Sequence, residues 1–230
     1  MNAPVAWLAL QQLLDSALPI GGFSHSFGLE TLVQEGRVRT SEQLEAYTVT
    51  MMMQSWAPAD AMIIKAVYNA RESGHWEETW HVERLVHVQR LAVETRSGME
   101  KMGRRLIKLS EAVFPQLDMA RLSSAAAERE TLGTYPLVYG YLCAELNISL
   151  EQAVQGYMYN CIVTSIGSAL RLMSIGQTEG QAIIARCAAQ TPAAWEMVRG
   201  MQPQEAWSNM PLVEIAMIRH ETLYSRLFMS

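Results

Sequence analysis

Charged side chains are scarce in this sequence. Asp, Glu, Lys and Arg make up 18% of its 230 residues, and together they give a formal net charge of −5. Non-specific nucleic-acid binding depends on clustered Lys and Arg, so a mildly acidic chain is a poor candidate for it. Half of the residues are hydrophobic, which indicates a folded protein with apolar surface to spare for another chain. We therefore expect a globular homodimer that binds no nucleic acid.

Cysteines and targeting segments are also sparse. The three cysteines, Cys143, Cys161 and Cys187, lie far apart and form no C-x-x-C pair, which indicates reduced thiols in the cytoplasm. The N-terminus has neither the basic region nor the apolar core of a signal peptide. Residues 152–170 carry no charge but contain several Gln, Asn, Ser and Thr residues. This composition favours a helix buried in the protein or at a subunit interface over a membrane span.

Signals for β-strands are missing as well. The sequence has no sustained alternation of apolar and polar residues and no Asn-Gly or Asp-Gly hairpin turn. Helical periodicity instead recurs from end to end, and neither an internal repeat nor a Ser/Gly-rich linker divides the chain. We expect one all-α domain over residues 1–230, folded as a multi-helix bundle, with mobile N-terminal and C-terminal segments.

One predicted helix has a complete set of signals. Ser149 and Gln152 fit a capping box, and apolar side chains then recur at helical spacing as far as Ile166. Gly156 and Gly167 lie off this apolar stripe, where they suggest the close approach of another helix. The other helices that we expect begin near Thr40 and stop before Pro58, run from about His75 towards Ser97, cover Met99–Ile107, extend from Pro136 through Leu146, and follow Leu212–Leu223.

Sequence motifs for catalysis are absent or incomplete. No G-x-x-x-x-G-K-[ST] string occurs, so we expect no nucleotide bound through a P-loop. The nearest match to the hydrolase motif G-x-S-x-G is Gly22-Phe23-Ser24-His25-Ser26, which lacks the final glycine and a preceding strand. Ser24 and His25 leave a hydrolase as an alternative, although a catalytic triad is defined by geometry and not by adjacency. We expect no catalytic residue and no cofactor.

Metal-binding patterns are equally incomplete. His220-Glu221 begins like the zinc motif H-E-x-x-H, but Tyr224 stands where the second histidine belongs. The three histidines of residues 75–87 are spaced by six residues, which turns neighbouring side chains about 120° apart on a helix. A chaperone that binds nickel directly is therefore a weaker alternative, and we expect no metal site.

Basic side chains gather in one region of this acidic chain. Within residues 84–108 the acids Glu94 and Glu100 stand among seven cations, which are Arg84, Arg90, Arg96, Lys101, Arg104, Arg105 and Lys108. One interpretation is a solvated helix face. The other is a docking patch for an acidic partner, which would mainly speed association.

Two segments have compositions that packing alone does not explain. In residues 18–30, Pro19 and the pair Gly21-Gly22 demand a specific turn. Residues 219–230 end on Arg226-Leu227-Phe228-Met229-Ser230, whereas chain ends are usually polar and frayed. An arginine beside an aromatic residue is typical of a contact hot spot, so this segment predicts a partner-binding site.

Together with residues 170–181, these two segments resemble the UreF family of urease accessory proteins, in the family's order and over essentially the whole chain. The resemblance implies an all-helical homodimer that works with a scaffold protein, UreD (also called UreH), and a nickel-carrying GTPase, UreG. The complex loads nickel into apo-urease, and the family member bridges scaffold and GTPase and influences GTP hydrolysis without catalytic residues of its own.

The resemblance also implies which residues bind partners. The candidates are Pro19, Gly21, Gly22, Ser24, Ser26, Gly28, Glu30, Arg171, Gly176, Gln177, His220, Glu221, Tyr224, Arg226, Leu227 and Phe228. Two positions depart from the family pattern: Ser174 stands where a proline is frequent, and Glu214 stands where Asp is common. Structural roles remain open for several candidates, because the glycines can shape turns, Arg171 can satisfy carbonyls at a helix end, and residues 178–181 can form a capping box.

Overall fold

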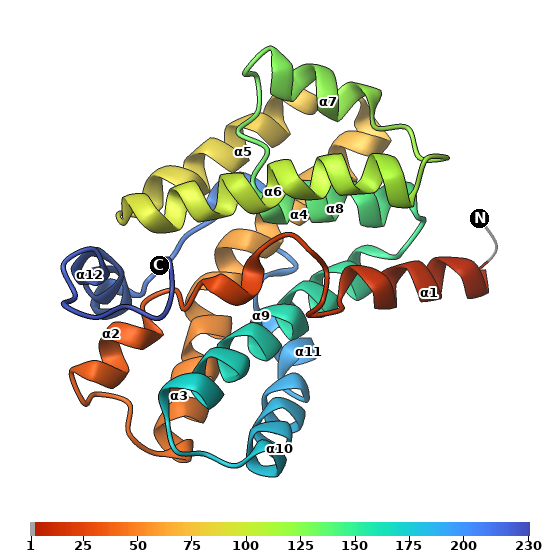
Figure 1. The fold of residues 1–230 in the computed structure, drawn as a ribbon. Coiled ribbons are helices and arrows are strands. Elements are labelled where there is room, and N and C mark those ends of the chain that lie inside the picture. The colour runs from red at the N-terminus through yellow and green to blue at the C-terminus, as the bar shows by residue number, and fades with distance from the viewer. Residues whose placement is uncertain (1–2) are drawn as a thin grey trace.

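Residues 3–230 are described by a computed structural model, and within this range the chain is helical with no β-strand (Figure 1). This confirms the all-α class. The α-helices are α1 (Ala3–Leu13), α2 (Leu29–Gln34), α3 (Ser41–Met51), α4 (Ala61–Ser73), α5 (Trp76–Gln89), α6 (Val93–Val113), α7 (Ala120–Ala127), α8 (Tyr135–Glu145), α9 (Leu150–Leu172), α10 (Gln177–Ala188), α11 (Thr191–Val198) and α12 (Pro211–His220). Two 3-10 turns, η1 (Gly22–Ser24) and η3 (Pro203–Glu205), and a π-helix, η2 (Met52–Asp60), complete the elements.

The core is built around α8, which is buried along nearly its whole length. Every residue from Tyr135 to Ala144 is buried, because α8 packs against both α4 and α6 (Figure 1). A Cβ atom on Gly140 would lie 3.2 Å from the Cα of Ile64, so the glycine lets α4 and α8 approach closely. A helix that is apolar on all sides belongs at the centre of a helical domain.

The helix predicted from Ser149 is α9, and its capping box is present. The Ser149 hydroxyl accepts from the Gln152 amide, and the Gln152 side chain accepts from the Ser149 amide. A Cβ atom on Gly156 would lie 2.8 Å from the Tyr139 hydroxyl, which confirms the predicted close approach of another helix. The same prediction is wrong for Gly167, which has no such neighbour within 4 Å.

The helix that begins at Thr40 does not stop before Pro58. Thr40 caps α3, and the chain continues through η2, which contains Pro58, into α4. Proline has no N–H group, so Pro58 cannot donate a hydrogen bond within η2. The amide of Asn209 donates to the Gln54 carbonyl at 2.9 Å, and the amide of Trp207 donates to the Pro58 carbonyl at 3.0 Å. A segment from near the end of the chain thus adds hydrogen bonds to the helix on both sides of the proline.

The helix predicted from residue 75 towards 97 is in fact two helices, α5 and α6, separated at Arg90–Ala92. Arg90 has an extended backbone, with ψ at 111°, and its guanidinium pairs with the buried carboxylate of Asp60. The carboxylate of Glu214 accepts the amide of Leu91 at 2.8 Å. A buried charge needs its counter-ion, and this pairing interrupts a stretch that is helical on both sides.

The apolar side chains buried by these helices form one continuous cluster, so the described residues share a single core. The uncharged stretch of residues 152–170 belongs to α9, which packs against α2, α4, α10 and α11. No helix within residues 3–230 has both the length and the apolar composition needed to cross a membrane.

Candidate protein-interaction site

The C-terminal tail, residues 221–230, lies against the turn segment, residues 18–30 (Figure 1). The carbonyl oxygen of Ser230 accepts hydrogen bonds from the Ser26 amide at 2.6 Å and from the Ser26 hydroxyl at 2.9 Å. The Ser230 hydroxyl lies 2.7 Å from Nδ1 of His25, and the Met229 amide donates to the Ser24 carbonyl at 2.8 Å. These bonds bury Ser230 and fix the register of the tail on the turn segment.

Glu30 provides the second anchor of the tail. This carboxylate lies in the first turn of α2 and is 1% exposed. It accepts the backbone amides of Leu227 at 2.7 Å and Phe228 at 3.1 Å, and it also contacts Nε2 of His220 at 3.0 Å. A buried carboxylate requires several donors, and the tail supplies two of them.

His220, the last residue of α12, is buried between two carboxylates. Its Nε2 faces Glu30, and its Nδ1 lies 2.8 Å from Oε2 of Glu94 on α6. Both ring nitrogens are therefore within hydrogen-bond distance of a glutamate side chain, one on α2 and one on α6. Glu94 also pairs with Arg226 of the tail at 2.6 Å. Glu30, Glu94, His220 and Arg226 thus form one network that links α2, α6, α12 and the tail.

Arg171, in the last turn of α9, joins the third motif to the other two. Its guanidinium carbon lies 4.3 Å from the centre of the Phe228 ring, and its Nη1 donates to the Phe23 carbonyl at 3.0 Å. Arg171 therefore does not merely satisfy carbonyls at the end of its own helix, because its side chain contacts both the turn segment and the tail.

The side chains of the tail alternate between inside and outside. Phe228 and Ser230 are 5% and 1% exposed, whereas Leu227 and Met229 are 50% and 53% exposed. Alternation with a period of two is the property of an extended chain with one face buried. The sequence placed Phe228 in a contact with a partner, but the structure buries its ring within this chain, where Arg171 and Glu30 hold it. Mobility of the tail in solution stays a prediction.

Two glycines of the turn segment are required by their surroundings. Gly28 has a φ of 88°, and a Cβ atom there would lie 3.0 Å from Cγ of Met217 and 3.2 Å from the Val213 carbonyl on α12. Gly21 has a φ of 89°, and a Cβ atom there would collide with Nη1 of Arg105. The structural interpretation therefore holds for both positions.

Other predicted residues lie outside these contacts. Gly176 and Gln177 are exposed at the start of α10, and the expected capping box of residues 178–181 is absent because Gly176 occupies the N-cap position. Pro19 and Glu221 are also exposed. Tyr224 has the most exposed side chain of the tail.

Gly22 is not required by close packing. A Cβ atom there would make only an ordinary van der Waals contact, 3.7 Å from the sulfur of Met102. Unlike Gly21 and Gly28, it has no positive φ that would favour glycine. Packing and backbone conformation therefore do not explain a glycine at position 22, and its role in partner binding stays a prediction.

Ser24 and His25 do not form a nucleophile and base pair. The Ser24 hydroxyl donates to the Gly21 carbonyl at 2.7 Å, while His25 bonds to Ser230. Burial, followed by the positive charges of Lys101 and Arg105, lowers the pKa of His25 from 6.5 to about 4. The geometry offers no activated serine, which counts against the hydrolase alternative.

Metal ligands do not converge in the part of the chain that the structure describes. Within residues 3–230, no three His, Cys, Asp or Glu side chains are grouped as they would be around an ion. Both ring nitrogens of His220 contact glutamate side chains of this chain, so neither faces an open position while this network is intact.

The sequence did not single out Glu94, which is a central member of the network. One sequence signal did point to it: Glu94 is one of only two acidic residues within the basic stretch of residues 84–108. Phe23 was likewise overlooked as an individual residue. Phe23 is 67% exposed, and its backbone carbonyl accepts a hydrogen bond from Arg171. Neither role can be read from spacing along one helix, because both depend on segments that meet only in the fold.

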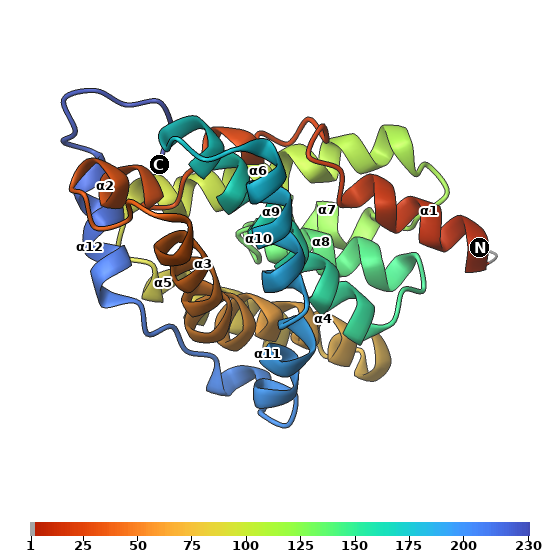
Figure 2. The same ribbon diagram turned by 90° about the horizontal axis from the view of Figure 1, so that it is seen from below.

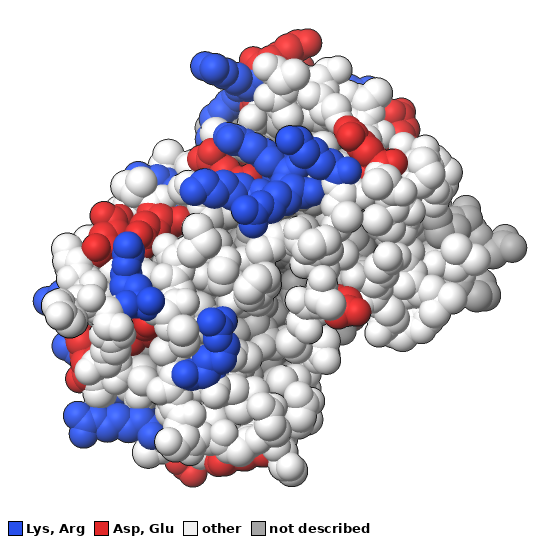
Figure 3. All heavy atoms as spheres, in the orientation of Figure 1, with Lys and Arg blue, Asp and Glu red and all other residues white. Residues whose placement is uncertain are grey.

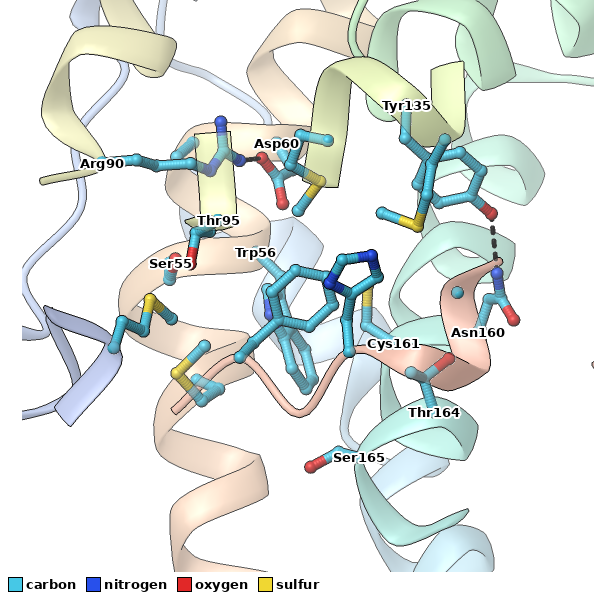
Figure 4. A pocket seen from close by; sticks show the side chains of 18 of the residues that line it. Ser55, Trp56, Asp60, Arg90, Thr95, Tyr135, Asn160, Cys161, Thr164 and Ser165 are labelled. Atoms are coloured by element: carbon cyan, nitrogen blue, oxygen red, sulfur yellow. Dashed lines mark hydrogen bonds and ion pairs between the residues drawn. The ribbon is translucent and has the colours of Figure 1, made fainter. Parts of the chain in front are cut away.

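A cavity of about 70 Å³ lies beneath the turn segment, between η2, α6 and α9 (Figure 4). The Asp60–Arg90 pair lines it, and the Tyr157 hydroxyl donates to Asp60 at 3.0 Å. Among the described residues, three polar atoms on its wall have no hydrogen-bond partner: Nη1 of Arg90, Oγ1 of Thr95 and Oγ of Ser165. A space of this size admits water molecules, which can satisfy such atoms.

The sequence profile of the UreF family matches residues 38–188. The urease accessory protein UreF of Actinobacillus pleuropneumoniae serotype 5b (strain L20) is 30% identical over 224 residues, which cover 96% of this chain and 98% of that protein. UreF of Haemophilus influenzae (strain PittEE) is also 30% identical, with 96% and 94% covered. UreF of Lachnoclostridium phytofermentans is 28% identical, with 97% and 98% covered. The resemblance carried by the three motifs is thereby confirmed, and this chain belongs to the UreF family of urease accessory proteins.

Proposed function

We propose that this chain is a non-catalytic bridging protein of urease maturation. It binds the scaffold protein UreD (or UreH) and the GTPase UreG, and the resulting complex inserts nickel into apo-urease in the cytoplasm. Within that complex the chain adjusts GTP hydrolysis by the GTPase and acts as a homodimer. Family membership supports the role in urease maturation, and the anchored tail supports a role in binding another protein.

The observation that carries this proposal is the way the tail is displayed. The tail backbone is held in place by its two buried residues, Phe228 and Ser230. Leu227 and Met229 consequently point outward, and Tyr224 is fully exposed. Large apolar side chains held on the outside by buried neighbours are suited to fill pockets on a partner. To the extent that its hydrogen bonds to the turn segment hold the tail in the free protein, binding costs less conformational entropy than it would for a free chain end.

A second exposed apolar surface supports the homodimer and further partners. On α12, Leu212, Ile215 and Ile218 are 63%, 45% and 43% exposed. Leu91 is 58% exposed, and its amide bonds to Glu214 of α12, so it lies beside them. Monomeric proteins rarely expose contiguous apolar surface of this kind.

Co-purification tests the proposal directly. The full chain is expressed with the scaffold protein and the GTPase, and the mass of the purified complex is measured by light scattering. We expect all three proteins in one complex and an even number of copies of this chain. Recovery of this chain alone, at every ratio of the three proteins, would overturn the bridging role.

The two alternatives have their own measurements. A hydrolase would turn over ester substrates as an isolated protein, and Ser24→Ala would abolish that turnover. A direct nickel chaperone would retain nickel in equilibrium dialysis as an isolated protein. We expect neither result, because Ser24 lacks a base and the described residues offer no ligand cluster.

A further inference from the structure

Four cations share the solvent face of α6. Lys101, Arg104, Arg105 and Lys108 are exposed and follow one another at i, i+3, i+4 and i+7, the spacing of one side of a helix. We call these four residues the basic face. Figure 3 shows Lys and Arg side chains gathered over the region of α6. The surface is notable because the chain as a whole carries a net charge of −5.

The orientation of the basic face is fixed by close packing on the other side of α6. A Cβ atom on Gly103 would overlap the Gly133 carbonyl, so the backbone of α6 rests directly on the segment that leads into α8. Met102 and Leu106 beside it are buried in the core. The helix therefore cannot turn its cations away from solvent, and the backbone positions from which they project are fixed.

Most of this positive charge has no counter-ion within the part of the chain that the structure describes. Arg104 pairs with Glu100 at 2.8 Å, whereas Lys101, Arg105 and Lys108 form no ion pair there. Elsewhere on the surface, arginines such as Arg186 do pair with nearby acids. A solvated helix face usually pairs many of its charges, and on this one three of the four cations have no ion pair among the described residues.

The basic face adjoins the anchored tail. Nη1 of Arg105 donates to the Ile20 carbonyl at 3.3 Å and lies against Gly21 of the turn segment. The charges of Lys101 and Arg105 reach His25, which bonds to Ser230 of the tail. The exposed ring of Phe23 lies at the other end of the same turn. The basic face is therefore linked by direct contacts to the turn segment, against which the tail is held.

We propose that the basic face docks a carboxylate-rich surface of the scaffold protein, next to the place where the scaffold engages the tail. This inference rests on the proposed function and specifies the chemistry of the partner. Complementary charge raises the rate at which two proteins meet and orients them on approach, so the basic face acts before the tail residues make contact. Phe23 supplies an apolar contact at the edge of the charged area.

A protein partner fits these observations better than nucleic acid. Duplex DNA is bound through many phosphates, and a protein that relies on this contact usually carries a strong excess of cations. Here four cations are surrounded by a chain of net negative charge, and the adjoining residues are Phe23 and the apolar side chains of the tail. This mixture matches the composition of protein interfaces.

The test measures association of the full chain with immobilised scaffold protein at about 50 mM and about 500 mM salt, because exposed charges are screened at high ionic strength. The variant Lys101→Gln/Lys108→Gln removes two cations that hold no other residue in place. We expect its association rate constant to fall about tenfold at low salt and to approach the unmodified protein at high salt. The variant Lys101→Glu/Lys108→Glu should associate more slowly still.

The matched control is Arg71→Gln/Arg199→Gln, which removes the same charge from α4 and from the end of α11. Figure 2 places these helices on the opposite side of the molecule from α6. The control should associate within about twofold of the unmodified protein. Equal rates for the basic-face variants and the unmodified protein at low salt, or an equal loss in the control, would overturn the proposal.

A Glu-rich peptide separates this inference from the proposed function. We expect the peptide to bind the unmodified chain and the control at low salt, and to bind the basic-face variants at least fivefold more weakly, on the order of 1 kcal/mol. If the scaffold fails to bind but the peptide discriminates, the proposed function fails and the surface stands. If the peptide does not discriminate, or if a DNA duplex is bound through the basic face with scaffold binding unchanged, the inference is wrong.

Discussion

The guanidinium carbon of Arg171 lies 4.3 Å from the centre of the Phe228 ring, and this contact joins the end of α9 to the tail. A cation over an aromatic face contributes roughly 0.5–2 kcal/mol, with the larger values where water is excluded. The ring of Phe228 is 5% exposed, although Arg171 itself reaches solvent. Because Arg171 also donates to the Phe23 carbonyl, one side chain holds the turn segment and the tail together.

Replacing Arg171 by Met keeps an apolar stem but removes the charge and the hydrogen-bond donors. We expect the tail to lose roughly 1 kcal/mol of anchoring, which corresponds to about fivefold faster exchange of the Met229 amide hydrogen. That amide reports on the tail because it donates to the Ser24 carbonyl. The control Arg199→Met alters an exposed pair with Glu196 and should leave the exchange unchanged. Equal protection in both variants would contradict the anchoring role.

Glu30→Gln tests the anchor on α2. The substitution keeps the shape of the side chain but places an NH₂ group against donors, since the carboxylate accepts from Leu227, Phe228 and His220. We expect the free energy of unfolding to fall by about 2–3 kcal/mol, measured by urea denaturation. Glu35→Gln is the control, because Glu35 bonds only exposed arginines, and it should leave the free energy of unfolding nearly unchanged. A stable Glu30→Gln protein would show that the network is not needed for folding.

The lowered pKa of His25 makes stability depend on pH. The folded protein holds the pKa of His25 at about 4, whereas the unfolded chain has the ordinary value of 6.5. Between these values the unfolded chain binds a proton that the folded chain does not, so stability is complete above pH 6.5 and falls as the pH drops towards 4. The largest loss is on the order of 3 kcal/mol. The groups that act on His25 are Lys101, Arg105, Glu94 and His220.

The measurement is the urea-unfolding free energy of the unmodified protein and of His25→Gln at several pH values from 7 down to 4. Other acids also titrate in this range, so the difference between the two slopes is the quantity of interest. We expect a shallower slope for His25→Gln. The control His75→Gln removes an exposed histidine and should keep the original slope. Parallel curves for all three proteins would show that His25 titrates normally in the fold.

Local signals explain which parts of the fold were predictable. The capping box of Ser149 and the initial proline of α8 are read within a few residues, and both predictions are confirmed. The passage of the chain through Pro58 was not predictable, because the added donors come from Trp207 and Asn209, far away in sequence. The break at Arg90 depends in the same way on Asp60, a partner on another helix.

The candidate site was predictable as three motifs but not as one structure. Composition indicated that the turn segment and the tail had roles beyond local packing, yet nothing along the chain pairs Ser26 with Ser230 or Arg171 with Phe228. The direction of each tail side chain was also hidden, since a period of two over four residues is too short to recognise. Burial of Phe228 therefore appeared only once the fold placed Arg171 and Glu30 beneath it.

The buried pair of Asp60 and Arg90 leads to a prediction about folding stability. Asp60→Asn leaves the Arg90 cation buried without its counter-ion, which we expect to cost about 3–5 kcal/mol. Adding Arg90→Met to this variant removes the unpaired charge and should recover at least about 1 kcal/mol. Glu196→Gln, in an exposed pair, should cost less than about 0.5 kcal/mol. Additive losses in the double variant would show that the two groups are not coupled.

Buried and exposed side chains alternate along the tail, so single substitutions can separate its contribution to folding stability from its contribution to partner binding. A deletion of residues 220–230 cannot separate the two. Such a deletion removes His220 and Phe228, both buried, and we expect it to lower the melting temperature along with partner binding. A loss of binding after that deletion would therefore have two explanations. Single substitutions on opposite sides of the extended tail resolve them.

Leu227→Ala and Phe228→Ala are the informative pair. Leu227 is 50% exposed, so its truncation should leave the melting temperature within about 2 °C while weakening scaffold binding by about 1–2 kcal/mol, roughly tenfold. Phe228 is buried under Arg171, so its truncation should cost about 3 kcal/mol of stability. The measurements are thermal unfolding of each variant alone and its dissociation constant for the scaffold protein. If Leu227→Ala melts normally and binds with full affinity, the outward face of the tail is not a docking surface, and the basic face of α6 then remains as the contact to test.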